Sequence, residues 1–301
     1  MDAMFALSAL QLTRQEDVPA GDSATETVGP RGRVGMRRNA QMYFDRALDS
    51  QRHGVGEDED EALVLEKTRE AAYLTSILLS VYALVALGEP PADDDPPEAS
   101  HAALVLWLRL STATQTAYHT YQPPASVQTP VQTALAWYGN THTRDEDRLY
   151  HTEQGRPFTQ LLTFAAEYET LSLSDTEIYT KVLSHISHTF KLSNSGAETP
   201  LQICQRLAAL PSRLPPRFTD LAEARAPRAL VMLAHVLLHM KLIENEVPLL
   251  RGIAGRQVCW IEGVVPRAWR ERMGFPMMIV EGEIRGMPPA NDAGRVWVGG
   301  V

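Results

Sequence analysis

Residues 229–277 read ALVMLAHVLLHMKLIENEVPLLRGIAGRQVCWIEGVVPRAWRERMGFPM, and this stretch decides the fold. It begins with a run of apolar residues, which suits either the core of a large helical domain or a membrane segment. The spacing predicts helices over 227–244 and 248–263, followed by a short third helix. The remaining sequence indicates whether other helices or a membrane surround them.

A second apolar segment, residues 71–88, tests the membrane interpretation. It carries no charge over 18 residues, which meets the bare length of a spanning helix. It also contains Ser76, Ser80 and Tyr82, and the acidic residues before it continue the same helical periodicity without a break. Because no other segment of the chain is both uncharged and predominantly apolar over this length, we expect a buried central helix of a large domain and no membrane partner.

The remaining periodicity is helical almost throughout. Apolar residues three and four apart predict helices over 2–16, 36–53, 57–87, 101–121, 157–171, 175–191 and near 199–209. Proline-rich or polar connectors separate them, at 88–100, 122–130, 139–156 and 210–227. Sustained alternation of apolar and polar residues, which would predict strands, does not occur. We expect an all-α fold, a single large helical domain of about nine or ten helices over 1–278, and an irregular tail over 279–301.

The charge balance argues against a surface built for nucleic acid. The chain has 28 lysine and arginine residues against 37 aspartate and glutamate residues, a formal charge of −9. Sequence-independent DNA binding depends on basic side chains that neutralise phosphates. The only dense basic cluster is Arg31, Arg33, Arg37 and Arg38, which is typical of a solvated helix start. We expect no direct DNA binding.

Two cysteines, Cys204 and Cys259, are too few for a disulfide scaffold or a four-cysteine zinc site. Both lie in apolar helical contexts, so we expect inert core thiols in a reducing compartment. The first residues, MDAMFALSALQLTRQED, have an acidic second position and lack a basic segment. They predict an amphipathic helix rather than a signal peptide, and hence an intracellular protein.

Two histidines lie four residues apart in the deciding stretch. His235 and His239 share one helix face and could together hold a metal, with Glu244 or Glu262 as a third ligand. The zinc-protease pattern needs a glutamate directly after the first histidine, and Val236 stands there. We therefore expect no metal. The histidines are expected to be core residues or the polar points of a mostly apolar pocket.

A second histidine pair offers an alternative site for proton transfer. His185 and His188 are three residues apart and, with Tyr179 and Asp175 upstream, could act as acid–base groups. The simpler interpretation is a helix edge with half-exposed histidines. The chain has no glycine-rich phosphate loop after a strand and no G-x-S-x-G elbow, so we expect no cofactor.

The order of these segments resembles a known family, the fungal-specific regulatory domain that follows zinc-cluster (two zincs, six cysteines) DNA-binding modules. The sterol-responsive regulators are the most similar members. The resemblance rests on MFALSALQLTR, NAQMYFDRALDSQR, REAAYLTSILLSVYALVALGE, HAALVLWLRL, ALVMLAHVLLHMKLIE, LLRGIAGRQV and RAWRERMGFPM, in that order over residues 3–278. The six cysteines and the basic linker of the DNA-binding module do not occur in this sequence.

The resemblance implies a helical regulatory domain in the nucleus or cytoplasm that responds to a ligand or partner. In the sterol-responsive members the ligand is a sterol in an apolar cavity, so a hydrophobic small molecule is the expected partner here. An alternative is a repurposed enzyme of fungal secondary metabolism, a cofactor-free cyclase or isomerase acting on a polyketide or terpenoid intermediate by confinement. A third is a dimerising or repressor-binding scaffold without a ligand, and a homodimer belongs to that hypothesis.

The expected pocket lies beside the 227–244 helix. A stripe of Leu230, Leu233, Leu237 and Met240 is predicted to pack against the helix over 74–87. His235 and His239 would then project from a neighbouring face into a cavity bounded by Tyr82, Trp107 and the helix that holds Tyr179. These five residues are the predicted ligand contacts. In the enzyme alternative, His185, His235 and His239 are the candidate catalytic groups.

Overall fold

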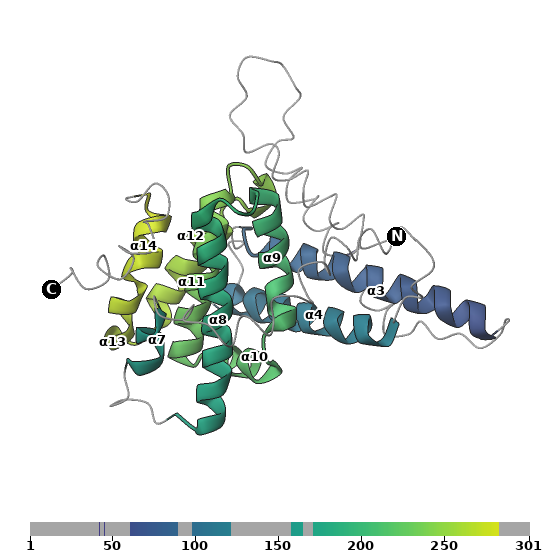
Figure 1. Cartoon of the computed structure of the whole chain (residues 1–301), viewed down its shortest axis with the longest axis horizontal. Coiled ribbons are helices and arrows are strands. Elements are labelled where there is room, and N and C mark those ends of the chain that lie inside the picture. The colour runs from purple at the N-terminus through teal and green to yellow at the C-terminus, as the bar shows by residue number, and fades with distance from the viewer. Residues whose placement is uncertain are drawn as a thin grey trace, which may run out of the picture.

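The computed structural model describes residues 61–89, 98–121, 158–164 and 171–282, together with Met42 and Asp45. Across these residues the fold is all-α, as predicted, and no strand occurs among them. The elements are α3 (Glu61–Ala86), α4 (Ala99–Tyr121), α7 (Gln160–Thr163), α8 (Leu173–Ser195), α9 (Pro200–Arg213), α10 (Pro216–Glu223), α11 (Pro227–Ile243), η2 (Pro248–Leu250), α12 (Ile253–Val264), α13 (Arg267–Arg270), η3 (Glu271–Met273) and α14 (Gly274–Val280) (Figure 1).

Several predictions fall on other residues. The helices expected over 2–16 and 36–53, the connectors at 122–130 and 139–156, the arginine cluster and the tail beyond residue 282 lie outside the described part, apart from the two single residues named above.

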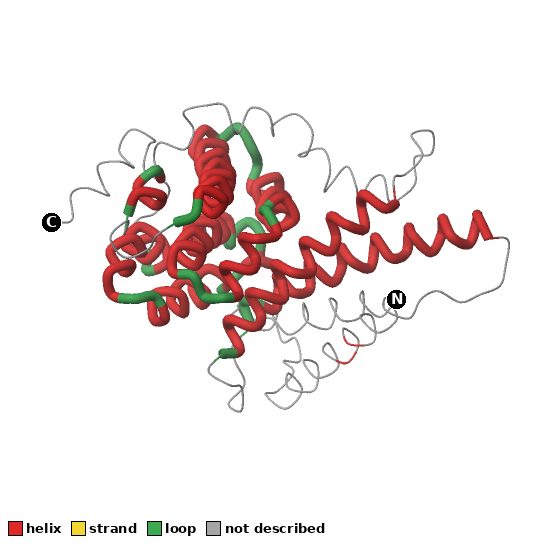
Figure 2. Tube along the Cα trace, turned by 90° about the horizontal axis from the view of Figure 1, so that it is seen from below, coloured by secondary structure: helices red, strands yellow, loops and turns green. Residues whose placement is uncertain are grey.

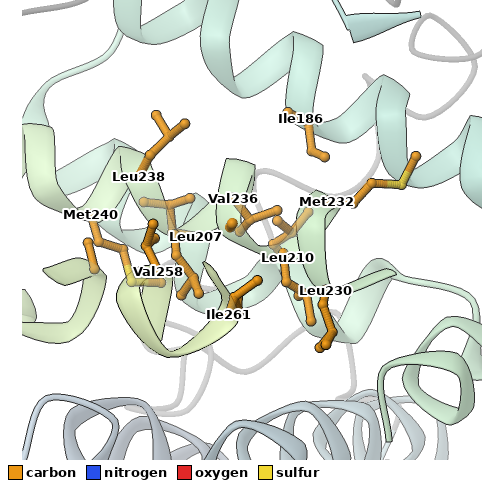
Figure 3. Packing of buried hydrophobic residues seen from close by; sticks show 14 of the residues in the cluster. Ile186, Leu207, Leu210, Leu230, Met232, Val236, Leu238, Met240, Val258 and Ile261 are labelled. Atoms are coloured by element: carbon orange, nitrogen blue, oxygen red, sulfur yellow. The ribbon is translucent and has the colours of Figure 1, made fainter. Parts of the chain in front are cut away.

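Helix α11 is the centre of the domain. Every side chain from Arg228 to Met240 is buried, because α8, α9, α12 and α14 enclose the helix on all sides. Figure 3 shows how this enclosure is built. Ile186 from α8, Leu207 and Leu210 from α9, and Val258 and Ile261 from α12 surround Leu230, Met232, Val236, Leu238 and Met240 of α11. A helix that is apolar all round is stable only when it is covered in this way.

The predicted packing of α11 against the 74–87 segment is wrong in detail. The extensive contacts of α11 are with α12, α8, α14 and α9, whereas α3, which contains that segment, packs mainly on α4. The physical reason is that the apolar residues of α11 cover its whole circumference. Its periodicity therefore predicts burial but cannot select which neighbour meets which face.

Helices α3 and α4 form a long antiparallel pair that extends away from the other helices (Figure 2). Polar side chains of the uncharged 71–88 segment are satisfied within this pair. The hydroxyl oxygens of Ser80 and Ser111 lie 2.7 Å apart, and the Ser76 hydroxyl donates to the backbone carbonyl of Tyr73 at 2.7 Å. These bonds explain how serines are accommodated in a buried helix.

The described helices were expected to include no membrane-spanning segment. None of them alone is both long and apolar enough to cross a membrane. Only α10 and α11 taken together, bent by 108° at their junction, reach the required length and composition.

Three stretches differ from the predicted boundaries. Of the helix expected over 157–171, the described residues form only α7 (Gln160–Thr163), and Phe164 after it has an extended backbone. The expected connector at 210–227 contains the end of α9 and all of α10, because a proline in the first turn starts a helix as readily as it ends one. The expected 248–263 helix is divided at Gly252, whose φ of +78° suits glycine. Glu244 holds this reversal together by accepting from Lys241 and from the backbone N–H of Gly252 at 3.3 Å.

Helix α9 begins at a complete capping box. The Thr199 hydroxyl accepts from the backbone N–H of Gln202 at 3.3 Å, and the Gln202 side chain accepts from the backbone N–H of Thr199 at 2.8 Å. Each bond satisfies a donor that the helix itself leaves unpaired.

Replacing Thr199 by alanine should lower the free energy of unfolding by about 1 kcal/mol, because it removes one half of this box. Urea denaturation of the variant and the wild type measures the difference. Thr176→Ala, which removes a hydroxyl that donates to the carbonyl of Ser172 just before α8, is the matched control and should change stability by less than about 0.5 kcal/mol. Equal losses in both variants would contradict the assignment.

Candidate functional site

The two central histidines lie among aromatic rings from three other parts of the chain. His235 and His239 occupy successive turns of α11 and are 0% and 1% exposed. Phe158, just before α7, contacts the ring of His235 edge to face, with centroids 5.7 Å apart. Phe190 of α8 does the same to His239 at 6.4 Å, and Phe275 of α14 packs on Phe190. We call these five residues the histidine–aromatic cluster.

The backbone fixes which ring nitrogen carries the proton. His235 Nδ1 lies 2.8 Å from the carbonyl oxygen of Val231, and His239 Nδ1 lies 3.0 Å from that of His235. A carbonyl oxygen only accepts, so both Nδ1 atoms are N–H donors and both Nε2 atoms carry a lone pair. His239 Nε2 is buried and makes no hydrogen bond to any residue in the described part of the chain.

Burial keeps both histidines neutral at physiological pH. Desolvation lowers the pKa of His235 and His239 from 6.5 to about 4, against the opposing effect of their backbone hydrogen bonds. The neighbouring His239 contributes a further, smaller lowering of the pKa of His235. The cluster therefore presents neutral imidazoles that accept hydrogen bonds, not imidazolium groups that donate protons.

A buried arginine holds in place the segment that carries Phe158, one member of the cluster. Arg228, in the first turn of α11, is 1% exposed and donates to the carbonyls of Leu161, Leu162 (2.8 Å) and Phe164 (2.7 Å). These carbonyls lie at the C-terminal end of α7, where a helix leaves acceptors unpaired and where a cation is favoured. Arg228 thus holds the 158–164 segment, and with it Phe158, against the core.

The arginine itself lies over two aromatic rings. Its guanidinium lies 4.9 Å from the ring centre of Trp269 and 5.8 Å from that of Tyr179. Trp269 belongs to the Trp-Arg motif near the C-terminal end of the described chain, and it also packs edge to face on Phe164. The motif therefore contributes to the attachment of the 158–164 segment.

The predicted site residues are all buried, but they do not all meet. His235 and His239 share one cluster, as their spacing predicted. Tyr179 lies on α8 and contacts Phe218 and Arg228. Tyr82 lies on α3 and Trp107 on α4, two helices that pack on each other, whereas the rings at the histidines come from the 158–164 segment and α8. A ligand contact at Tyr82, Trp107 or Tyr179 stays a prediction.

The second histidine pair differs from the half-exposed helix edge that was expected. His185 is buried, at 4% exposed, and only His188 is partly exposed. The backbone carbonyl of His185 accepts from the hydroxyl of Thr189 at 2.9 Å. Helix α8 is covered along this face, which the three-residue spacing alone could not show.

The acidic residues proposed as metal ligands have other partners. Glu244 binds Lys241 and the Gly252 N–H, and Glu262 lies 3.6 Å from Arg270. Within the described ranges, no three histidine, cysteine, aspartate or glutamate side chains lie close enough to hold a metal ion.

The two cysteines have different environments. Cys204 is buried, and burial raises the pKa of its thiol to about 11, which suits an inert core residue as predicted. The same prediction is wrong for Cys259, which is exposed on α12. Partial desolvation and the charges of Glu281 and Glu262 raise the pKa of this thiol, so it too is a poor nucleophile at neutral pH.

Sequence reasoning missed the partners of the histidines. Phe158, Phe190 and Phe275 lie on separate elements, and no spacing connects them to α11. The role of Arg228 could have been predicted from the sequence, because it is the only charged residue of this mostly apolar helix before the last turn. A lone charge at such a position indicates a buried, hydrogen-bonded role.

Comparison with known proteins gives no match to a family model, to a curated protein or to a solved structure.

Proposed function

We propose that this domain binds an apolar small molecule at the histidine–aromatic cluster and works as a ligand-responsive regulatory domain of the kind it resembles. The observation that carries the proposal is the lone pair of His239 Nε2, buried among aromatic rings at the centre of the domain. A nuclear or cytoplasmic location belongs to the same proposal, because it rests on the resemblance.

The chemistry of the cluster supports a small-molecule site. Such sites are lined mostly by aliphatic and aromatic side chains, with a few polar atoms that fix orientation. Here the polar atoms are the two imidazoles, and the lining rings belong to phenylalanines. A buried acceptor without a donor costs about 1–3 kcal/mol, which a ligand that supplies the donor would recover.

The 158–164 segment offers the route to the cluster. Helix α7 is four residues long, the Phe158 ring covers His235, and the segment is attached through Arg228 and the buried Leu161. Displacing Phe158 would expose the edge of the His235 ring without disturbing the long helices. A ligand ring in its place would regain the same edge-to-face contact.

The enzyme alternative receives less support from the cluster. Isomerisation or cyclisation assisted by proton transfer works best when the catalytic pKa lies near the working pH. Burial lowers the pKa of His235 and His239 to about 4, so at neutral pH they are weak bases. The burial of these histidines therefore favours binding without turnover.

Native mass spectrometry of the protein purified from a fungal host tests the proposal. We expect a population that carries an apolar small molecule, which extraction with organic solvent removes. His239→Phe should reduce this population at least severalfold. His101→Phe is the matched control, because His101 lies outside the cluster on α4, stacked on Trp260. A protein that carries no small molecule and takes up none would favour the scaffold alternative, and a chemically altered ligand would favour the enzyme.

A further inference from the structure

We propose that the polar group of the ligand is a hydrogen-bond donor, an alcohol or phenol hydroxyl, and not a ketone, an ether or a carboxylate. The inference rests on the proposed function and adds the chemical class of the ligand. It follows from the way in which the backbone of α11 fixes the imidazole of His239.

A free imidazole can place its proton on either nitrogen, so it can usually meet a donor or an acceptor. His239 has lost this freedom. Its Nδ1 lies 3.0 Å from the carbonyl of His235 and 3.3 Å from that of Val236, two acceptors that both require a proton on Nδ1. Moving that proton to Nε2 would set a lone pair against two carbonyl oxygens. The atom that faces a ligand at Nε2 is therefore an acceptor.

The same arrangement is repeated one turn earlier. His235 Nδ1 donates to Val231 at 2.8 Å, so both histidines of the cluster are fixed in the same tautomer. The other members of the cluster, Phe158, Phe190 and Phe275, have no polar side-chain atoms and offer a ligand neither a donor nor an acceptor. A ketone or ether oxygen placed here would meet a lone pair and lose its hydrogen bonds to water.

The charges near the cluster argue against an acidic ligand. The buried cation beside it, Arg228, already donates to three backbone carbonyls of the 158–164 segment. A carboxylate brought to His239 would be desolvated without a counter-ion from the cluster itself, which is strongly unfavourable. A neutral hydroxyl avoids this cost and supplies the donor that His239 Nε2 can accept.

The test compares two probes that differ only at the polar group. 2-Naphthol and 2-methoxynaphthalene share one aromatic body, and only naphthol donates a hydrogen bond. Titration calorimetry of the whole chain at pH 7 should show naphthol binding about tenfold more tightly, the effect of one buried hydrogen bond. His239→Phe should reduce the ratio to near one. His185→Phe, which changes a buried histidine of α8 outside the cluster, should leave the tenfold ratio intact.

The outcomes separate the two proposals. Equal affinities of the wild type for naphthol and its ether, or tighter binding of the ether, would overturn the donor inference and leave the proposed function standing. Binding of neither probe would overturn both.

A second measurement needs no substitution. The ¹⁵N chemical shifts of the His239 ring in the wild-type protein report the tautomer directly. We expect a protonated Nδ1 and a bare Nε2 whose shift moves when naphthol is added. A protonated Nε2 in the free protein would overturn the inference, even if His239→Phe failed to fold.

Discussion

Lowering the pH from 7 to 4 should lower the free energy of unfolding by about 6 kcal/mol through His235 and His239 alone. The folded domain holds the pKa of both side chains at about 4, while the unfolded chain returns them to 6.5. The unfolded state therefore binds more protons than the folded state between these values. The stabilisation by neutral histidines is complete above pH 6.5 and is lost as the pH falls toward 4, by roughly 3 kcal/mol for each histidine.

Urea denaturation at half-unit intervals from pH 4 to 7.5 measures this dependence. Carboxylates also titrate in this range, so the comparison is with the double variant His235→Leu, His239→Leu, which keeps every carboxylate. The wild type should lose about 6 kcal/mol more than the double variant across the interval. Parallel pH profiles for the two proteins would show that the histidines are solvated and that the cluster is not closed.

Replacing Arg228 by methionine should lower the free energy of unfolding by roughly 3–5 kcal/mol. Methionine has a similar length and fills the apolar part of the space, but it cannot donate. The carbonyls of Leu161, Leu162 and Phe164 would lose their donor in a buried position, and the stacking on Trp269 would be lost with the charge. Few single substitutions of a charged residue have a comparable effect.

Arg109→Met is the matched control for Arg228→Met. Arg109 also binds two oxygen partners, Asp220 at 2.8 Å and Glu223, but its side chain is 46% exposed. Surface pairs of this kind contribute about 0–1 kcal/mol, so the control should be nearly as stable as the wild type. Denaturation midpoints and slopes of the three proteins give the comparison. Similar losses in both variants would mean that Arg228 acts as an ordinary surface charge.

The amino-acid sequence predicted those parts of the fold that depend on local patterns. The apolar run after Pro227 predicted the central helix to within one residue of its end, and the uncharged 71–88 segment predicted a buried helix. The packing partners could not be predicted, because α11 is apolar on every side and its pattern has no preferred direction. Helix α10 was missed since the prolines at its start resemble the prolines of a connector.

The candidate site was predicted only in part for a similar reason. The four-residue spacing of His235 and His239 is local and was visible in the sequence. Their aromatic neighbours are Phe158 and Phe190, which lie far away along the chain and meet the histidines only through tertiary packing. The fixed tautomer depends on distances of about 3 Å between side chain and backbone, which no sequence pattern reports.

The attachment of the 158–164 segment through Arg228 has a consequence for how affinity could change. If a ligand enters by displacing Phe158, it binds only those molecules in which the segment has opened. Its apparent dissociation constant is then the intrinsic constant divided by the fraction of open molecules. A substitution that weakens the hydrogen bonds of Arg228 to the 158–164 segment would raise that fraction and tighten binding, although Arg228 is not a member of the histidine–aromatic cluster. The same substitution would lower the free energy of unfolding. One side chain would therefore change ligand affinity and domain stability in opposite directions.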